Sequence, residues 1–213
     1  MFTGIVQAVG VVRTVRKGER ATRLEIGFGA WRHLPSPGDS IAVNGCCLTV
    51  VEAADREGET VASFDAIPQT LAVTAVGALA PGSRVNLEHA ATAATYLGGH
   101  IVLGHVDGLA EVVEIRTAGE WRVRVRIPAD FARFVVDKGS VALDGVSLTI
   151  AAVEPTPAGE VIDVCLIPET LARTTLGALA AGSRIHLEVD HLAKLVARQV
   201  DLMAAKDRAA RGG

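Results

Sequence analysis

Apolar and polar side chains alternate along one stretch in the first half of the chain, and the rest of the sequence is organised around it. Successive side chains of a β-strand point to opposite faces of the sheet. One face of this stretch carries Cys46, Leu48 and Val50, and we expect that face in a hydrophobic core. The other face carries Cys47 and Thr49, small polar groups that can bond a ligand or take part in chemistry.

The same strand returns one hundred positions later. In the second copy the apolar face carries Val146, Leu148 and Ile150, and the polar face carries Ser147 and Thr149. Because valine replaces Cys46, we predict that this cysteine behaves as a small hydrophobic residue. Because serine replaces Cys47, the heteroatom of that side chain is the feature that matters.

Long internal identity accompanies the repeated strand. Residues 67–88 and 167–188 align without a gap and are identical at 15 of 22 positions. A period this long exceeds the usual solenoid unit, so it indicates a duplicated domain. We therefore divide the chain into an N-terminal unit at 1–97, a C-terminal unit at 98–190 and a tail at 191–213.

Short strand-like segments separated by glycine turns fill each unit. In the first unit they cover residues 4–15, 22–28, 40–52, 60–66 and 83–89. Short strands with little helix are typical of a small closed barrel, so we predict an all-β protein. Proline suits the first helical position, and Pro68 and Pro168 should each begin a helical turn. Residues 89–100 are rich in small side chains and should form a linker or a short connecting helix.

The last segment changes to a helical pattern. Its apolar stripe follows a 3-4-3 spacing through Leu192, Leu195, Gln199 and Leu202, with Val196 and Met203 alongside. We predict an amphipathic helix over residues 191–208. The helix has no counterpart after the first unit, so a barrel does not need it to close. It either packs on its own unit or joins copies of the chain through a short helical seam, and we favour the seam.

Composition limits the classes of function. The chain has 213 residues, 49% of them hydrophobic, and a net charge of −3, without the basic stripe of a nucleic-acid binder. Its three cysteines form no CxxC pair and no even disulfide set, which indicates a reducing compartment. The N-terminus lacks the positive region of a signal peptide, and no apolar run reaches the length of about 18 residues that a membrane span needs. We expect a cytoplasmic protein that binds neither nucleic acid nor membrane.

A second strand offers another candidate site. Residues 121–127 alternate cleanly and place Arg122, Arg124 and Arg126 on one side. Such a face is either an anion site or an ordinary solvated strand face, and the second is far more common.

Differences between the two copies point to chemistry. Ile5 becomes His105, Gly38 becomes Lys138, Asn44 becomes Asp144, Cys47 becomes Ser147 and Gln69 becomes Glu169. The second copy gains titratable groups while the first keeps a thiol. Two similar pockets that treat two similar molecules differently would produce this pattern, and surface drift is the alternative. His100 and His105 belong to no recognisable ligand motif, so we predict no metal site.

Five motifs extend over the chain. They are Met1-Phe2-Thr3-Gly4-Ile5-Val6, Asn44-Gly45-Cys46-Cys47-Leu48-Thr49-Val50, Gly98-Gly99-His100, Gly104-His105-Val106-Asp107-Gly108 and Ile167-Pro168-Glu169-Thr170-Leu171. Together they closely resemble the riboflavin synthases of the trimeric alpha-chain type. The resemblance implies two tandem six-stranded Greek-key barrels, a C-terminal helix that helps assemble a homotrimer, and no cofactor.

The resemblance also implies a reaction, the last step of riboflavin biosynthesis. One 6,7-dimethyl-8-ribityllumazine molecule donates a four-carbon unit to a second, giving riboflavin and 5-amino-6-ribitylamino-2,4-pyrimidinedione. Both substrates are the same compound, which accounts for a duplicated pocket. By the family pattern, each site holds two lumazines between the N-terminal barrel of one chain and the C-terminal barrel of its neighbour. The same pattern allows association with lumazine synthase.

The site residues are carried over by motif. In the first barrel, the substrate-binding residues are Phe2, Gly4, Ile5, Val6, Cys47, Leu48, Thr49, Asp65, Ala66, Ile67, Pro68, Gln69 and Thr70. In the second barrel, they are Gly104, His105, Val106, Lys138, Ser147, Leu148, Thr149, Cys165, Leu166, Ile167, Pro168, Glu169 and Thr170. One departure is Leu103, which stands where a polar residue is often seen.

Four of these residues are the catalytic candidates: Cys47, His105, Ser147 and Thr149. Cys47 would add to C7 of one lumazine or hold the attacking water, and the other three would relay protons at the C7 methyl group. Phe2 would order an N-terminal segment over the pocket. The alternatives are a non-catalytic lumazine or flavin carrier, which would let one pocket degrade, and a purely structural trimer. Because both copies keep their polar strand, we favour the enzyme.

Overall fold

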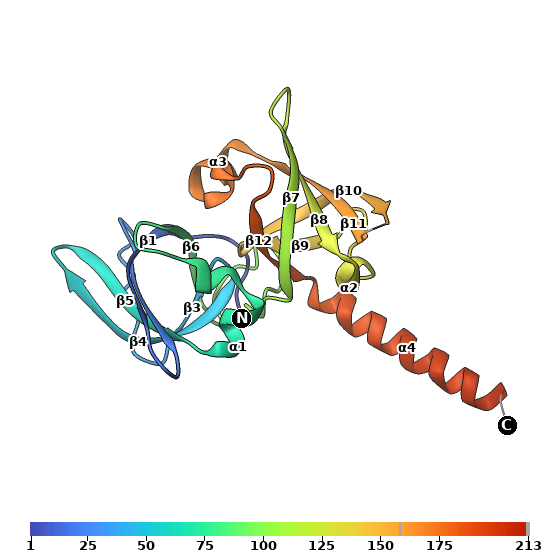
Figure 1. Ribbon diagram of the computed structural model, residues 1–213, viewed down its shortest axis with the longest axis horizontal. Coiled ribbons are helices and arrows are strands. Elements are labelled where there is room, and N and C mark those ends of the chain that lie inside the picture. The colour runs from blue at the N-terminus through green and yellow to red at the C-terminus, as the bar shows by residue number, and fades with distance from the viewer. Residues whose placement is uncertain (158, 212–213) are drawn as a thin grey trace.

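The structure is a computed structural model that describes residues 1–157 and 159–211. Two six-stranded barrels follow one another along the chain, and a long helix extends from the second (Figure 1). The first barrel contains β1 (Ala8–Lys17), β2 (Thr22–Gly27), β3 (Ser40–Val43), β4 (Cys46–Arg56), β5 (Glu59–Ala66) and β6 (Arg84–His89). The second contains β7 (Gly108–Arg116), β8 (Trp121–Pro128), β9 (Ser140–Leu143), β10 (Val146–Thr156), β11 (Gly159–Leu166) and β12 (Arg184–Val189).

Both barrels are closed and share one strand order. Around the first barrel the order is β1-β2-β5-β4-β3-β6, and the second follows the same cycle with the equivalent strands. The register shifts at equivalent points, between Val50 and Glu52 in β4 and between Ile150 and Ala152 in β10. Such bulges bend a strand and increase its twist, which helps a small sheet to close on itself. The prediction of two tandem Greek-key barrels with a C-terminal helix is confirmed.

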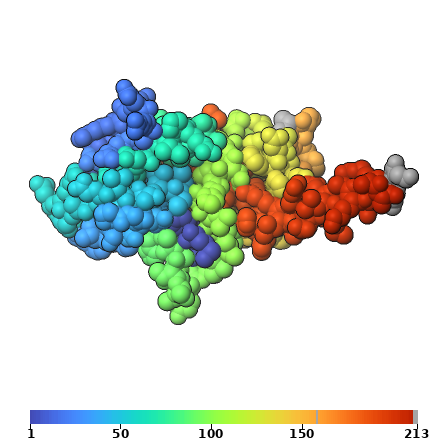
Figure 2. All heavy atoms as spheres, turned by 90° about the horizontal axis from the view of Figure 1, so that it is seen from below, coloured from blue at the N-terminus to red at the C-terminus, as the bar shows by residue number. Residues whose placement is uncertain are grey.

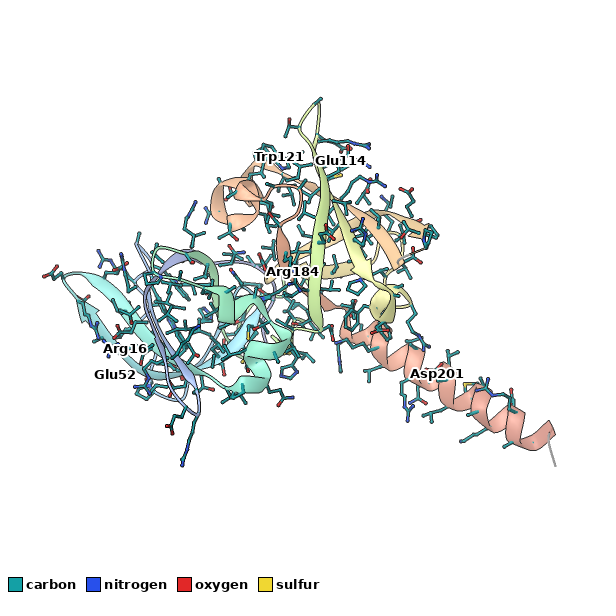
Figure 3. All side chains as sticks on the ribbon, in the orientation of Figure 1. Arg16, Glu52, Glu114, Trp121, Arg184 and Asp201 are labelled. Carbon is teal, nitrogen blue, oxygen red and sulfur yellow. The ribbon has the colours of Figure 1, made fainter. Side chains whose placement is uncertain are left out.

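Each barrel encloses its own hydrophobic core. Figure 3 shows the side chains that fill the two interiors. The first core includes Leu24, Ile26 and Phe64, and the second includes Val125 and Ile162. These interiors are separate, so the fold contains two packed units that meet along a shared junction.

Short helices follow β5 and β11, as the two prolines predict. They are α1 (Pro68–Val73) and α3 (Pro168–Arg173), each continued by a 3₁₀ turn, η1 (Ala75–Ala78) and η2 (Thr175–Ala178). A further turn, α2 (Ala129–Ala132), follows β8. The linker between the barrels contains no helix: the described backbone at residues 90–100 forms turns and bends.

The C-terminal helix, α4 (His191–Arg211), is longer than predicted and projects away from both barrels (Figure 2). Two ion pairs tie it to the second barrel. Lys194 Nζ lies 2.6 Å from Asp107, and Asp201, labelled in Figure 3, pairs with Arg133 at 2.9 Å. No helix in the described part of the chain is both long and apolar enough to cross a membrane.

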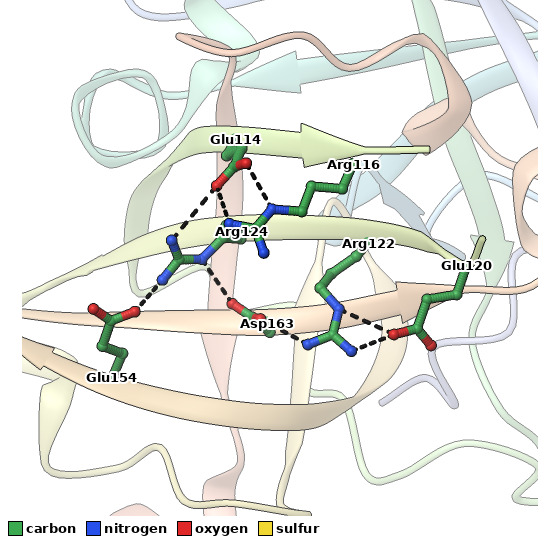
Figure 4. A network of polar contacts seen from close by, with 7 residues as sticks. All are labelled: Glu114, Arg116, Glu120, Arg122, Arg124, Glu154 and Asp163. Atoms are coloured by element: carbon green, nitrogen blue, oxygen red, sulfur yellow. Dashed lines mark hydrogen bonds and ion pairs between the residues drawn. The ribbon is translucent and has the colours of Figure 1, made fainter. Parts of the chain in front are cut away.

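The arginine strand is a solvated face held together by ion pairs. Arg124 reaches Asp163 at 3.0 Å and also pairs with Glu154, while Arg122 reaches Asp163 at 2.9 Å (Figure 4). Arg126 pairs with Glu111 on the neighbouring strand β7 at 2.7 Å. Because carboxylates already occupy all three guanidinium groups, the anion-site interpretation is wrong.

Candidate active site

The repeated strand begins with a tight hairpin turn. Asn44 and Gly45 have φ of 47° and 77°, and Asp144 and Gly145 have 45° and 77°. Positive φ at both central residues, with an Asn-Gly or Asp-Gly pair, is the signature of a type I′ turn. The strand predicted over 40–52 is therefore two strands, β3 and β4. The two turns touch where the barrels meet, because a Cβ on Gly45 would lie 2.6 Å from the backbone nitrogen of Gly145.

The two faces of β4 divide as the alternation predicts. Cys46, Leu48 and Val50 are 5%, 4% and 2% exposed and line the barrel core, whereas Thr49 is exposed. Burial, with a smaller effect of neighbouring Cys47, raises the pKa of the Cys46 thiol to about 12. Cys46 is therefore a core residue with no thiolate chemistry near neutral pH.

Two extended segments cross between the barrels. Phe2 N–H donates to Val102 at 2.6 Å, and Val102 N–H donates back to Phe2 at 3.1 Å. Ser147 N–H then donates to the carbonyl of Gly4 at 2.8 Å, and Cys47 N–H donates to Gly104 at 2.9 Å. Figure 2 shows the N-terminal residues, in dark blue, at the junction of the two barrels. Each segment therefore runs along the polar strand of the opposite unit.

This crossing corrects the assignment of pocket residues to barrels. We assigned Gly4 to Val6 to the first barrel and Gly104 to Val106 to the second. In the structure Val6 belongs to the second core, and Val106 packs against the first. The exposed imidazole of His105 therefore lies beside the Cys47 strand, on the opposite barrel from Ser147.

Two buried carboxylates hold the crossing segments. Glu88 accepts hydrogen bonds from Thr3 N–H at 2.7 Å, the Thr3 hydroxyl at 2.6 Å and Gly4 N–H at 3.0 Å. Glu188 accepts only two, from Leu103 N–H at 2.6 Å and Gly104 N–H at 3.0 Å. Burial raises the pKa of both carboxyl groups, and it raises that of Glu188 to about 7.

A cavity of about 220 Å³ opens beside the second copy of the strand. It is lined by Gly4, Ile5, Val6, Val146, Ser147, Ile167, Glu169, Thr170, Arg173 and Thr174. Seven of these ten were predicted from sequence, and they come from both ends of the duplicated chain. Val146, Arg173 and Thr174 were not predicted. Arg173 forms an ion pair with Glu169 one helical turn earlier.

Ser147 has a partner that the sequence comparison missed. Its hydroxyl lies 2.7 Å from Nδ1 of His100, and the other ring nitrogen is buried without a hydrogen-bond partner among the described residues. Burial lowers the pKa of His100, so the ring is neutral near pH 7, although Asp190 opposes this shift. A neutral imidazole bonded to a hydroxyl beside a cavity can exchange protons with a ligand.

The first copy has no equivalent of this pair. The Cys47 side chain is half-buried, and it packs against the junction cluster of Phe2, Ala42, Val102 and Ala142. Phe2 is itself fully buried in that cluster. It therefore fastens the barrels together, while Gly4, Ile5 and Val6 of the same segment line the cavity. That Phe2 orders this segment over the pocket stays a prediction.

Other predicted residues fall into three groups. Leu48, Ala66, Leu148 and Leu166 point into the barrel cores, so their side chains do not face a ligand. Asp65 is exposed and forms a bidentate ion pair with Arg23 at 2.7 and 2.8 Å, which lowers the pKa of its carboxyl. Other residues that do not line the 220 Å³ cavity are Ile67, Pro68, Gln69, Thr70, Lys138, Thr149, Cys165 and Pro168.

The comparisons with known proteins agree with this geometry. The family described as "Lumazine binding domain" matches residues 3–90 and 103–190, one match for each barrel. A curated riboflavin synthase of Mycobacterium tuberculosis is 46% identical over 199 residues, covering 93% of this chain and 97% of the relative. The chain belongs to the riboflavin synthase family. A second synthase, from Photobacterium phosphoreum, is 38% identical over 202 residues and covers 93% of this chain and 88% of its own length.

Solved structures place ligands on the same fold. LumP complexed with 6,7-dimethyl-8-(1'-D-ribityl) lumazine superposes with a TM-score of 0.73 at 28% identity, covering 90% of this chain and all of LumP. LumP complexed with riboflavin gives a TM-score of 0.72. In the described part of this member of the riboflavin synthase family, no three His, Cys, Asp or Glu side chains gather into a group that could hold a metal ion.

Proposed function

We propose that this chain converts two molecules of 6,7-dimethyl-8-ribityllumazine into riboflavin and 5-amino-6-ribitylamino-2,4-pyrimidinedione. The observation that carries the proposal is the paired polar strand, present in both barrels and lined in each by the segment that precedes the other barrel. The four-carbon unit that one lumazine loses is the unit that the other gains. All atoms of the two substrates appear in the two products, so no external oxidant is required.

The duplicated barrels, residues 1–97 and 98–190, would each hold one lumazine. Fixing two reactants in an aligned geometry replaces a dilute encounter, and this effect can lower the barrier by roughly 7–11 kcal/mol. Cys47 and Thr49 would contact one substrate, and Ser147 and Thr149 the other. The two substrates of the reaction are identical, which suits two pockets of common origin.

His100 and Ser147 are the proposed proton relay. The Ser147 oxygen would accept a proton from the C7 methyl group while its own proton passes to Nδ1 of His100 at 2.7 Å. The imidazolium that forms would be stabilised by the charge of Asp190, which favours protonation of the ring. In this proposal His100, and not His105, is the histidine that exchanges a proton with Ser147.

The active assembly is proposed to be a homotrimer in the cytoplasm. The exposed apolar stripe of α4 supports self-association: Leu195, Val196 and Met203 are 50%, 64% and 66% exposed. A continuous apolar stripe of this kind marks an interaction surface. If each site lies between the first barrel of one chain and the second of its neighbour, His105 of one chain would face Ser147 of the next.

The role of the stripe is tested by its own variants. Replacing Leu195 and Val196 together with aspartate should reduce the mass measured by light scattering from trimer to monomer. Arg208→Ala, on the opposite face of α4, is the matched control and should remain a trimer. A trimer that survives the aspartate variant would show that another surface assembles the chain.

The reaction itself is tested with purified protein and the lumazine. We expect riboflavin absorbance to grow with one riboflavin formed for every two lumazines consumed, and with the pyrimidinedione in equal amount. Binding of lumazine without turnover would instead indicate a carrier. That second candidate is favoured by the likeness to LumP, whose solved complexes contain lumazine, riboflavin and flavin mononucleotide. If the protein shows no lumazine binding and no turnover, a purely structural assembly is the remaining interpretation.

A further inference from the structure

One buried polar side chain on the last strand of each barrel reaches across to the other barrel. Asn86 on β6 and His186 on β12 occupy equivalent positions and are 1% and 2% exposed. Their strand neighbours point into the barrel cores, so both side chains face the junction between the barrels. A buried polar group there needs a partner for each polar atom. Among the described residues, the hydrogen bonds of both side chains go to the opposite barrel, and Nδ1 of His186 also lies 3.9 Å from the Asp144 carboxylate of its own barrel.

The two partners of His186 determine which ring nitrogen carries the proton. Nε2 lies 2.7 Å from the backbone nitrogen of Ala75, and Nδ1 lies 2.7 Å from the carbonyl oxygen of Asn44. A backbone N–H can only donate and a carbonyl can only accept. The ring must therefore be neutral, with the proton on Nδ1 and a free electron pair on Nε2.

Asn86 makes the same two bonds with an amide. Its nitrogen donates to the carbonyl oxygen of Asp144 at 2.9 Å, and its oxygen accepts from Thr175 N–H at 2.8 Å. The amide nitrogen corresponds to Nδ1 of the imidazole and the amide oxygen to Nε2. Histidine and asparagine are therefore interchangeable here in hydrogen-bonding terms, although their shapes and charges differ.

The turn residues complete a cluster with approximate two-fold symmetry. Asn44 Oδ1 accepts from the backbone N–H of Asn86 at 2.7 Å, and Asp144 Oδ1 accepts from that of His186 at 2.8 Å. Each hairpin turn thus fixes the backbone of its own last strand, while the side chain of that strand bonds the other barrel.

The anchored amides begin the 3₁₀ turns that follow the proline helices. Ala75 is the first residue of η1, one residue after α1 ends, and Thr175 is the first residue of η2, one residue after α3 ends. Neither proline helix has a fully buried residue, and its packing on the barrel rests on a half-buried leucine, Leu71 or Leu171. The anchored amide adds a directional contact to that packing. The segment around α3 lines the cavity through Thr170, Arg173 and Thr174.

We propose that Asn86 and His186 are positioning residues, and that each holds the helix wall of the opposite barrel's pocket in place through one backbone amide. Asn86 and His186 are called the cross-barrel braces below. The wall of one candidate site is then fixed to the barrel that forms the other, so the two halves keep a common geometry. The amide contacts stand on their own, whereas the effect on catalysis rests on the proposed function.

Amide hydrogen exchange tests the contacts without any substrate. His186→Leu should lower the protection of the Ala75 amide about tenfold or more, the order expected when one buried hydrogen bond is lost, and should leave Thr175 protected. Asn86→Leu should do the reverse. His186→Asn, which copies the other brace, should restore Ala75. Nitrogen-15 spectra of the wild-type ring should show the proton on Nδ1.

The effect on function is read from lumazine turnover. Asn86→Leu, which frees the Thr175 amide next to the cavity wall, should lower kcat/KM about tenfold, and Asn86→His, which copies the other brace, should recover it. Arg16→Gln, an exposed position on β1 (Figure 3), is the control and should match the wild type in both assays.

Several outcomes would overturn the proposal. They are unchanged protection of Ala75 in His186→Leu, loss of both amides in both leucine variants, failure of His186→Asn to rescue protection, or a ring protonated on Nε2. If neither the wild type nor any variant forms riboflavin, the proposed function fails. The hydrogen-exchange and nitrogen-15 results still show whether Asn86 and His186 hold the two amides. If a leucine variant does not fold, His186→Gln and the wild-type ring spectrum carry the test.

Discussion

The two halves of the junction share a backbone and differ in chemistry. In the first barrel, Cys47 is a free, half-buried thiol that packs against a buried apolar cluster. Beside the second, Ser147 bonds His100 next to an open cavity. The turn, the strand and the proline helix are the same in both. Duplication thus provides two copies of one framework, and among the described residues the His100–Ser147 pair lies on the second of them.

The largest expected effect comes from removing the pair that only the second half has. Ser147→Ala should lower kcat by about 10²–10⁴-fold, the range usual for a lost acid–base group, with a much smaller change in lumazine affinity. His100→Gln should fall in the same range because it interrupts the same relay. Steady-state kinetics and lumazine titration separate the two effects.

The first half provides the matched control for that loss. Cys47→Ser makes the first strand resemble the second, and its kcat should stay within about tenfold of wild type because no relay partner is lost. Equal losses at Cys47 and Ser147 would contradict a division of labour between the halves and would restore the thiol as a nucleophile.

The acidity of His100 sharpens the comparison further. Burial lowers its pKa below the usual value of 6.5, so the ring stays neutral and basic to lower pH than a free histidine. Activity that depends on the neutral ring should therefore fall only below pH 6.5, and this acid limb should disappear in the residual activity of His100→Gln. A limb centred above pH 6.5 would assign the titration to another group.

The next prediction concerns the close packing of the segment around Gly104 against the Cys47 strand. A Cβ on Gly104 would lie 2.6 Å from the Cys47 Cβ and 2.8 Å from the Phe2 ring, and its φ is +77°. Gly104→Ala should lower the free energy of unfolding by about 3 kcal/mol through overpacking and backbone strain. Chemical denaturation measures this change.

Gly38 separates the cost of backbone strain from the cost of overpacking. Its φ is +94°, but no atom lies within 4 Å of a Cβ placed there, so Gly38→Ala should cost only the backbone strain of about 1–2 kcal/mol. The equivalent residue Lys138 already adopts a φ of +63°. If Gly38→Ala and Gly104→Ala cost the same, close packing at the crossing is not what requires glycine.

Much of the architecture followed from local pattern. The period-two alternation around Cys47 predicted which side chains enter the core, and the prolines at 68 and 168 predicted where helices begin. These features depend on neighbours in sequence. The Asn-Gly turn at 44–45 is also a local signal. The expected strand at 40–52 nevertheless included it, although the turn separates β3 from β4.

The crossing of the segments could not be obtained in this way. The repeat makes Gly4 equivalent to Gly104. That equivalence is the same whether each segment packs on its own barrel or on the other barrel, so the sequence does not distinguish the two arrangements. Comparison of the copies could not single out His100 either, because the aligned stretch of the first copy starts at Met1, which pairs with Ile101. Both features are contacts between segments far apart in the sequence, which a comparison of the two copies does not reveal.

The smallest expected effect tests the unequal carboxylates that hold the crossing segments. Thr3 gives Glu88 a hydroxyl donor at 2.6 Å, and Leu103 gives Glu188 none. Leu103→Thr should supply it, while Leu103→Val has the same shape without the hydroxyl and is the control. The threonine variant should exceed the valine variant in free energy of unfolding by about 1 kcal/mol at pH 8.

The sign of its pH dependence follows from the pKa of Glu188. In the folded protein burial raises that pKa from 4.5 to about 7, so ionisation is harder in the folded state. The stability this carboxyl contributes is full below pH 4.5 and is lost as the pH rises through 7. A hydroxyl donor favours the carboxylate and lowers its pKa, so the advantage of threonine over valine should grow between pH 5 and 8. If denaturation curves show a constant difference across that range, the hydroxyl does not reach Glu188, and the two carboxylates differ for another reason.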